Sequence, residues 1–390
     1  MSNNWNVVPF TEAVDICDTL RKPINSSERA SRIKGKEQSE LYPYYGATGQ
    51  VGFIDDYITD GEYVLLGEDG APFLDAFSNK AYIISGKTWV NNHAHVLRSK
   101  TNNKFLCYYL NSFNYKGYVS GTTRLKLTQA EMKRIPVPVP PLSEQERIVS
   151  RIEELFSQLD AGVETLKKTK AQLAVYRQAV LKEAFESVIP ESDTCNVEDV
   201  CKDIKVGIVI KPAQYYTSAD VGVRAFRSAN VREFAVNDSD WVYLTKAGHE
   251  ANLRSEIHTG DVLVVRSGYP GTACVVPPTY NGCNAIDILI AVPYAEKILP
   301  EYLCAYTNSP LGKRIIQEKK RGVAQAHFNV SGYSKTPIIV PCLETQKRVV
   351  AEIDSRLSVC DSIEQTVDTA LQQAEAMRQS ILKDAFEGSL

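Results

Sequence analysis

VPPLSEQERI, at residues 139–148, returns in similar form as VPCLETQKRV at residues 340–349. A shift of 201 positions aligns residues 140–186 with 341–387 without a gap, and about 17 of the 47 aligned pairs are identical. The identical pairs include Gln145 and Gln346, Asp160 and Asp361, Arg177 and Arg378, and Phe185 and Phe386. An internal repeat of this length predicts two copies of one structural unit.

Both copies carry the apolar spacing of a long helix. In the first copy an apolar residue recurs every seven positions, and the second copy repeats this register, which predicts a coiled-coil seam. Ile363 and Met377 stand three residues after seam positions, where the first copy has Gly162 and Tyr176. Gly162 is either complementary to Ile363 or a gap facing solvent. The residues expected in helix-pair packing are Ile152, Leu159, Leu166, Leu173, Val180, Ile353, Ile363, Val367, Met377 and Ile381.

The stretches before the helices repeat more faintly. Residues 121–136 match residues 322–337 in length at the same shift, each running from a glycine to a proline, and LCYYLNS at 106–112 resembles LCAYTNS at 303–309. Pro140, Pro141 and Pro341 prevent the helices from extending backwards. We therefore expect a globular domain over 1–142, a helix over 143–188, a second domain over 189–342 and a helix over 343–390. A helix of about 44 residues would be roughly 65 Å long.

Composition narrows the class of protein. The apolar share is 44%, the charged share is 23% and the net charge is −3. These values are typical of a folded, soluble protein, and the charge alone does not suggest a nucleic-acid binder. No leader and no membrane-spanning stretch is expected, and the nine cysteines show no CxxC pair. We expect reduced cysteines, a cytoplasmic location and no membrane partner.

Signatures of catalysis are weak. ISGKT at 84–88 ends like a phosphate-binding loop, but Ala81 stands where the first glycine of that motif belongs. His93 and His95 lack nearby partners for a metal site, and the adjacent acids Glu68 and Asp69 are interpreted as turn residues. We expect no catalytic residue, no metal and no cofactor on this chain.

The order of features resembles a known family. A proline-rich strand ending in P-x-L-x-x-Q, followed by a heptad helix that closes in LKxAFE, is present twice. With YPYYGATGQVGFIDDYITDGEYVLLGEDGAPF at 42–73, this resembles the specificity subunit of type I restriction-modification enzymes. The resemblance implies an α+β fold with two globular mixed α/β target recognition domains. Two long antiparallel coiled-coil helices would separate them, with a pseudo-twofold internal repeat.

The resemblance also implies a function. Each domain would read one half of a bipartite, asymmetric site in double-stranded DNA, without catalysis by this chain. The helices would dock two modification subunits, which methylate adenine, and restriction or motor subunits would join where the system has them. S-adenosylmethionine, ATP and Mg²⁺ are expected only on those partners. Because the chain is nearly neutral, we expect it to bind DNA weakly alone and tightly with its partners.

Hydrogen-bond donors in glycine-bounded loops are the candidates for DNA contact. In the first domain they are Lys34, Lys36, Tyr44, Tyr45, Thr48, Gln50, Asn91, Asn92, His93, Thr122, Thr123, Arg124 and Lys126. In the second they are Arg224, Arg227, Ser228, Asn230, Arg232, Arg266, Ser267, Tyr269, Lys320, Arg321, Gln325, His327 and Asn329. The two sets differ at most positions, so we expect different half-sites.

Two other classes of function remain open from the residues. Paired helices could organise two protein-binding or small-molecule-binding domains as a scaffold. An enzyme acting alone would need a paired acid and base or a ligand cluster, and none stands out in the sequence.

Overall fold

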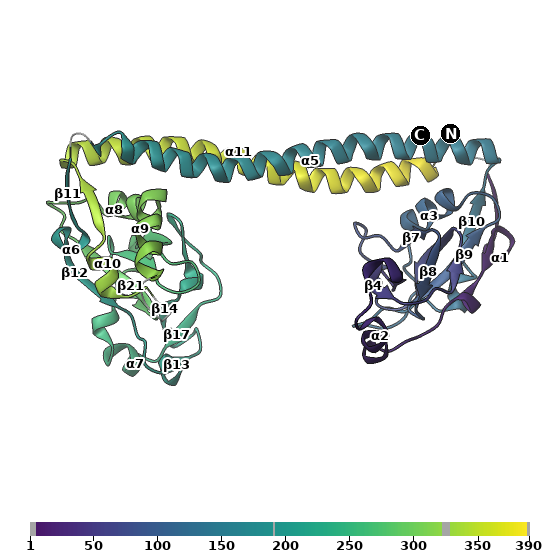
Figure 1. Ribbon diagram of the computed structural model, residues 1–390, viewed down its shortest axis with the longest axis horizontal. Helices are drawn as coiled ribbons and strands as arrows, with labels where there is room; N and C mark the ends of the chain where they lie inside the picture. Colours follow the sequence, from purple (N-terminus) through teal and green to yellow (C-terminus); the bar gives the residue numbers. More distant parts are fainter. Residues whose placement is uncertain (1–4, 190–191, 322–327, 388–390) are drawn as a thin grey trace. The chain divides into compact units, whose positions relative to one another are not determined.

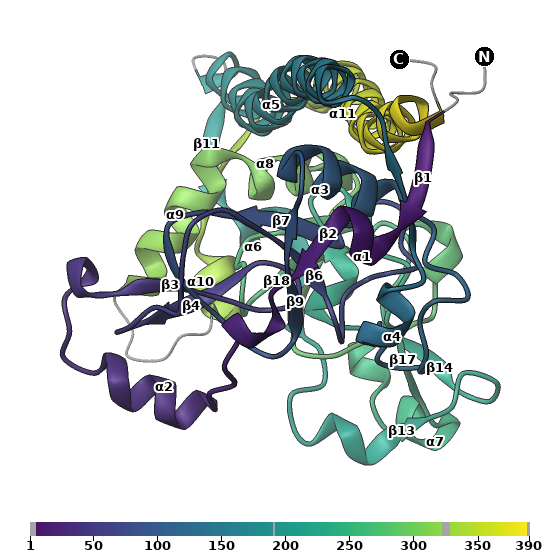
Figure 2. The ribbon, with the colours of Figure 1, turned by 90° about the vertical axis from the view of Figure 1, so that its right-hand side faces the viewer.

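The computed structural model describes residues 5–189, 192–321 and 328–387. It contains two compact units, residues 1–167 with 367–390 and residues 168–366. Each unit consists of a globular part and segments of the two long helices, α5 (Leu142–Glu186) and α11 (Leu343–Glu387). Both helices have 45 residues, and in each unit their segments lie side by side (Figures 1 and 2). No helix in the described ranges combines the length and apolar character needed to cross a bilayer.

Three sheets are found among the described residues of the first unit. A four-stranded sheet has the order β2 (Val14–Ile16), β9 (Ala94–Ser99), β6 (Tyr63–Gly67), β7 (Ala81–Ile84). A second has the order β4 (Gln50–Ile54), β3 (Tyr42–Tyr45), β8 (Lys87–Val90), β5 (Thr59–Asp60). β1 (Asn6–Pro9) pairs antiparallel with the proline-rich β10 (Pro136–Val139). The helices are α1 (Phe10–Ala13), α2 (Ser26–Ile33), α3 (Asn103–Ser112) and α4 (Gln129–Met132).

The second unit repeats this framework. Its main sheet has the order β12 (Cys201–Val206), β21 (Ile288–Pro293), β18 (Val262–Val265), β19 (Ala273–Val275). Another has the order β13 (Tyr216–Thr217), β17 (Val242–Leu244), β14 (Val223–Phe226), β20 (Asn284–Ala285). Two antiparallel pairs are β11 (Asp193–Asn196) with β22 (Pro337–Val340), and β15 (Val231–Arg232) with β16 (Ala235–Val236). The helices are α6 (Val197–Val200), α7 (Lys246–Glu250), α8 (Pro300–Asn308), α9 (Pro310–Arg321) and α10 (Val330–Ser334). The predicted duplication is therefore a duplication of the fold.

The repeated glutamine explains the P-x-L-x-x-Q motif. Gln145 is buried, donates to the Pro140 carbonyl at 2.9 Å and accepts from the Thr101 hydroxyl, which precedes α3. Gln346 is buried in the same way. Its amide donates at 2.9 Å to the carbonyls of residues 341 and 297, and its oxygen accepts from the Leu299 amide, which precedes α8. Each amide thus bonds the start of a long helix to the globular part of the same unit.

The closing LKxAFE motif has a related role. In the second unit, the Phe185 ring near the end of α5 packs edge-on against Tyr302 and Tyr306 of α8, with centroids 5.2 Å apart. In the first unit, Phe386 of α11 packs against Phe105 and Tyr109 of α3. Each globular part is therefore held by the beginning of one long helix and the end of the other, so the helix segments run antiparallel.

The heptad register has a buried side, as expected. The buried seam residues are Ile152, Leu173, Val180, Ile353 and Val367, and the half-buried ones are Leu159, Leu166 and Ile381. In the first unit Ile152 clusters with Leu382 and Ala385. In the second unit Val180 belongs to the same core as Ile353 and Leu357.

The prediction was wrong for two of the packing residues. Ile363 is 40% exposed and Met377 is 55% exposed, and the space around Gly162 is open. The second packing residue of each heptad lies four positions after the seam residue, as Phe156 and Leu357 do, and not three positions after it. The first copy has apolar residues at both spacings, Leu155 and Phe156, so the pattern did not distinguish them.

The repeated arginines also stand four positions after seam residues. Arg177 and Arg378 are equivalent in the repeat, 201 positions apart. Arg378 pairs with Asp160 in the first unit. Arg177 pairs with Asp361 at 2.6 Å and with Glu364 at 3.0 Å in the second. The same repeated aspartate and arginine thus form one cross-helix ion pair in each unit.

Substituting Gln346 by alanine should destabilise the second unit. The Leu299 amide and the carbonyl of residue 297 would lose a buried partner, which costs about 1–3 kcal/mol. Hydrogen exchange of peptides from residues 168–366 measures the loss. Gln172→Ala, at an exposed site on α5, is the matched control and should change stability by less than about 0.5 kcal/mol. Equal protection in both variants would contradict the role given to Gln346.

Candidate nucleic-acid interface

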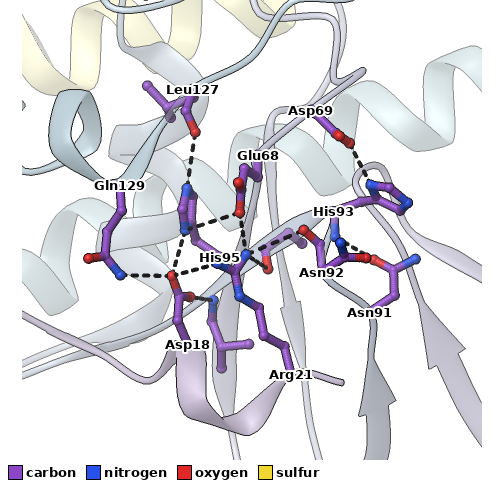
Figure 3. A network of polar contacts seen from close by, with 12 residues as sticks. Asp18, Arg21, Glu68, Asp69, Asn91, Asn92, His93, His95, Leu127 and Gln129 are labelled. Carbon is purple, nitrogen blue, oxygen red and sulfur yellow. Dashed lines mark hydrogen bonds and ion pairs between the residues drawn. The ribbon is translucent and has the colours of Figure 1, made fainter. Parts of the chain in front are cut away.

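Glu68, Asp69 and Gly70 follow strand β6 and connect three loops of the first unit (Figure 3). The Glu68 amide donates to the His93 carbonyl at 2.8 Å, and the Glu68 carbonyl accepts from the Leu127 amide at 2.7 Å. The Glu68 carboxylate forms an ion pair with Arg21 and lies 3.3 Å from the Lys126 ammonium. Backbone and side chain of one residue therefore fix the positions of several candidate residues.

Asp69 holds the outer part of the same network. Its Oδ1 lies 2.6 Å from His93 Nδ1 and 2.9 Å from Arg124 Nη2. Gly70 has φ +71°, and a Cβ added there would lie 3.2 Å from Arg124 Nε. Arg124 thus lies across the glycine backbone with its guanidinium on Asp69.

The inner part of the network is buried. His95 has no exposed surface, and its ring nitrogens lie 2.8 Å from Asp18 Oδ2 and 3.1 Å from the Leu127 carbonyl. Burial alone would raise the pKa of Asp18, but hydrogen bonds from His95, the Val96 amide and Gln129 outweigh it and lower that pKa. This inner part supports the loop that carries Arg124.

The predicted residues of the first unit fall into distinct groups. Those with exposed side chains are Lys34, Thr48, Gln50, Asn92, Thr122, Thr123, Arg124 and Lys126. His93 is half-buried beside Asp69. Lys36 is also exposed and is paired with Asp55 at 3.0 Å, and the half-buried Tyr45 packs against Tyr82.

Two predictions in this unit need correction. Tyr44 is 4% exposed and packs with Ile54 and Trp89 in a hydrophobic cluster. Asn91 is buried, and its oxygen accepts from the His93 amide. Both side chains are buried and bond or pack within the unit, so neither is available for a direct DNA contact.

In the second unit, three predicted arginines are held by acids. Arg227 lies 3.0 Å from Asp240, Arg266 lies 3.0 Å from Asp287, and Arg224 lies 3.9 Å from Asp238. The Nε atoms of Arg227 and Arg266 are buried, and no partner for them is found among the described residues.

The other predicted residues of this unit differ in exposure. Arg232, Tyr269 and Asn329 are exposed, and Asn329 caps α10 through the Gly332 amide. Asn230 is fully buried and bonds the carbonyls of residues 237 and 239, so its prediction as a DNA contact is corrected. The side chains of Lys320 and Arg321, and all of Gln325 and His327, lie outside the described residues.

A groove of about 1070 Å³ brings several of these residues together. Ser228, Arg232, Ser267 and Tyr269 line it, and α9 contributes Lys313 and Gln317. Sequence reasoning missed Lys313, Gln317 and, in the first unit, Arg21. The spacing of residues 313 and 317, one helical turn apart, was the available signal. Among the residues that the structure describes, no group of three His, Cys, Asp or Glu could hold a metal ion.

Asp18→Asn should destabilise the first unit at neutral pH by about 1–3 kcal/mol, because buried donors lose a charged acceptor. The folded pKa of Asp18 lies below its ordinary value of 3.8, so its contribution is complete above pH 3.8. It disappears as pH falls through the folded pKa. Denaturant unfolding from pH 7 to pH 3, with Asp15→Asn as control, should show the difference shrinking only below about pH 4. A difference that shrinks already at about pH 6 would contradict this assignment.

The amino-acid sequence is similar to those of a known family. Residues 4–174 match the family described as the type I restriction modification DNA specificity domain. A Haemophilus influenzae protein, provisionally described as a type I restriction enzyme specificity subunit, is 28% identical over 94% of this chain and 91% of its own length. The EcoBI specificity subunit of Escherichia coli is 25% identical over 92% of this chain and 79% of its own length.

A solved chain from work on assembly and conformational transition of the type I R-M system has a similar fold. Its TM-score is 0.72 at 17% identity, and the match covers 100% of this chain and 99% of that one. The duplicated framework, the family match and these relatives agree. Over more than nine tenths of its length the chain is therefore similar to type I restriction enzyme specificity subunits, and its residues 4–174 match the DNA specificity domain.

Proposed function

We propose that each globular part reads one half of a bipartite, asymmetric DNA target. One observation carries this proposal: the two units share a backbone framework but have side chains of opposite charge at equivalent positions. The Leu127 amide donates to the Glu68 carbonyl in the first unit, and the Phe328 amide donates to the Arg266 carbonyl in the second. Glu68 and Arg266 each follow the central strand of the main sheet, so they occupy equivalent positions.

The charges at these equivalent positions are opposite. After β6 the chain presents Glu68 and Asp69, whereas after β18 it presents Arg266 and Ser267. At the end of β6, Gly67 pairs with Ala94, and at the end of β18, Val265 pairs with Ile288. The residues just before these partners, a histidine at 93 and an aspartate at 287, are therefore equivalent. Carboxylates and guanidinium groups hydrogen-bond to different base edges. Two domains with such different groups are suited to different half-sites.

We further propose that two modification subunits dock on the helices and that S-adenosylmethionine, ATP and Mg²⁺ are held by partner subunits. Exposed apolar side chains on helix segments of the second unit support docking: Val175, Val359 and Ile363 are 72%, 57% and 40% exposed. Burial of such side chains favours association. The partners would also supply the phosphate contacts that a chain of net charge −3 lacks.

Arg124→Ala and Arg266→Ala should each relax a different half of the target. Loss of one good arginine contact to a base costs about 1–3 kcal/mol, which is roughly 5-fold to 150-fold in discrimination at that position. Base-resolution mapping of adenine methylation in cells that also express the modification subunit measures both halves. Relaxation of both halves by either variant alone would contradict independent reading.

A further inference from the structure

We propose that Asp69 is a specificity-determining residue: it restrains Arg124 and thereby limits contact with DNA of the wrong sequence. This inference rests on the proposed contact between Arg124 and DNA. It concerns a carboxylate that was interpreted from sequence as a turn residue.

Asp69 has two bonds: one holds Arg124, and the other orients the Asp69 carboxylate itself. Asp69 Oδ1 is shared between Arg124 Nη2 at 2.9 Å and His93 Nδ1 at 2.6 Å, so the carboxylate is itself oriented by the loop before β9. Arg124 also crosses Gly70, where a side chain would meet its Nε at 3.2 Å. The guanidinium therefore has a defined position before DNA arrives.

The exposures show that the restraint can be released. The Arg124 side chain is 61% exposed and that of Asp69 is 24% exposed. An ion pair this exposed is weak, so DNA can displace it with an effect of no more than about fivefold. In the second unit Asp287 holds Arg266 at 3.0 Å, but there the arginine is the less exposed partner, at 16% against 44%.

The carboxylate affects correct and incorrect DNA differently. Non-specific binding depends almost entirely on neutralised phosphates, and a carboxylate beside Arg124 opposes any phosphate contact. In the cognate complex a prepositioned guanidinium loses less side-chain conformational entropy when it contacts its base. Removing the charge of Asp69 should therefore strengthen non-specific binding more than cognate binding.

The test uses the full chain assembled with its modification subunit. Binding to a duplex with the target found by methylation mapping and to a duplex without it is measured over a range of salt concentrations. For Asp69→Asn we expect non-specific affinity to rise about 2-fold to 5-fold. The salt slope should steepen by about 0.9, the value for one additional phosphate contact. Discrimination should fall by a similar factor.

Matched variants separate the outcomes. Asp60→Asn, at an exposed site on β5, makes the same change in net charge and should have little effect, and Asp69→Glu should keep the wild-type salt slope. The effect of Asp69→Asn should vanish in an Arg124→Ala background. An effect that persists there, or one equal to that of Asp60→Asn, would overturn the inference. If Arg124→Ala itself changes neither binding nor methylation, the proposed Arg124 contact fails and the inference fails with it.

Discussion

A buried glutamine amide sets the position of each long helix on its globular part. Gln145 and Gln346 are the fourth residues of their helices, and each satisfies backbone or hydroxyl groups on both the helix side and the domain side. Because an unpaired buried polar group is costly, other orientations of the helix start are disfavoured. Phe185 and Phe386 then secure the opposite helix end to the same globular parts through aromatic packing.

This framework leaves the loops free to differ. The backbone bonds that follow the central strands are equivalent in the two units, yet acids follow one strand and an arginine follows the other. In the proposed function, duplication with repeated anchors and divergent loops lets one fold recognise two DNA sequences. The residue that anchors the framework lies next to the one that holds the proposed reading residue: the Glu68 carbonyl bonds to the framework, whereas the neighbouring Asp69 holds the exposed Arg124.

The sequence alone was sufficient for the repeat and the two long helices, because these are visible in the aligned residues and in the seven-residue apolar spacing. It was not sufficient for the seam spacing, since Leu155 and Phe156 fit both registers. Tyr44 and Asn230 were misread because a donor in a polar loop can bond inward as well as outward, and only the folded chain decides. Asp69 was missed as a partner of Arg124 because 55 residues separate them.

The most direct test of two independent readers is a chain in which residues 190–340 replace residues 1–139. The strand pairs β1 with β10 and β11 with β22 are equivalent, so the replacement keeps the connection to α5. Adenine methylation would be mapped at base resolution in cells that contain the modification subunit. We predict a methylated motif whose two halves carry the same bases. Retention of the original asymmetric motif would contradict the account.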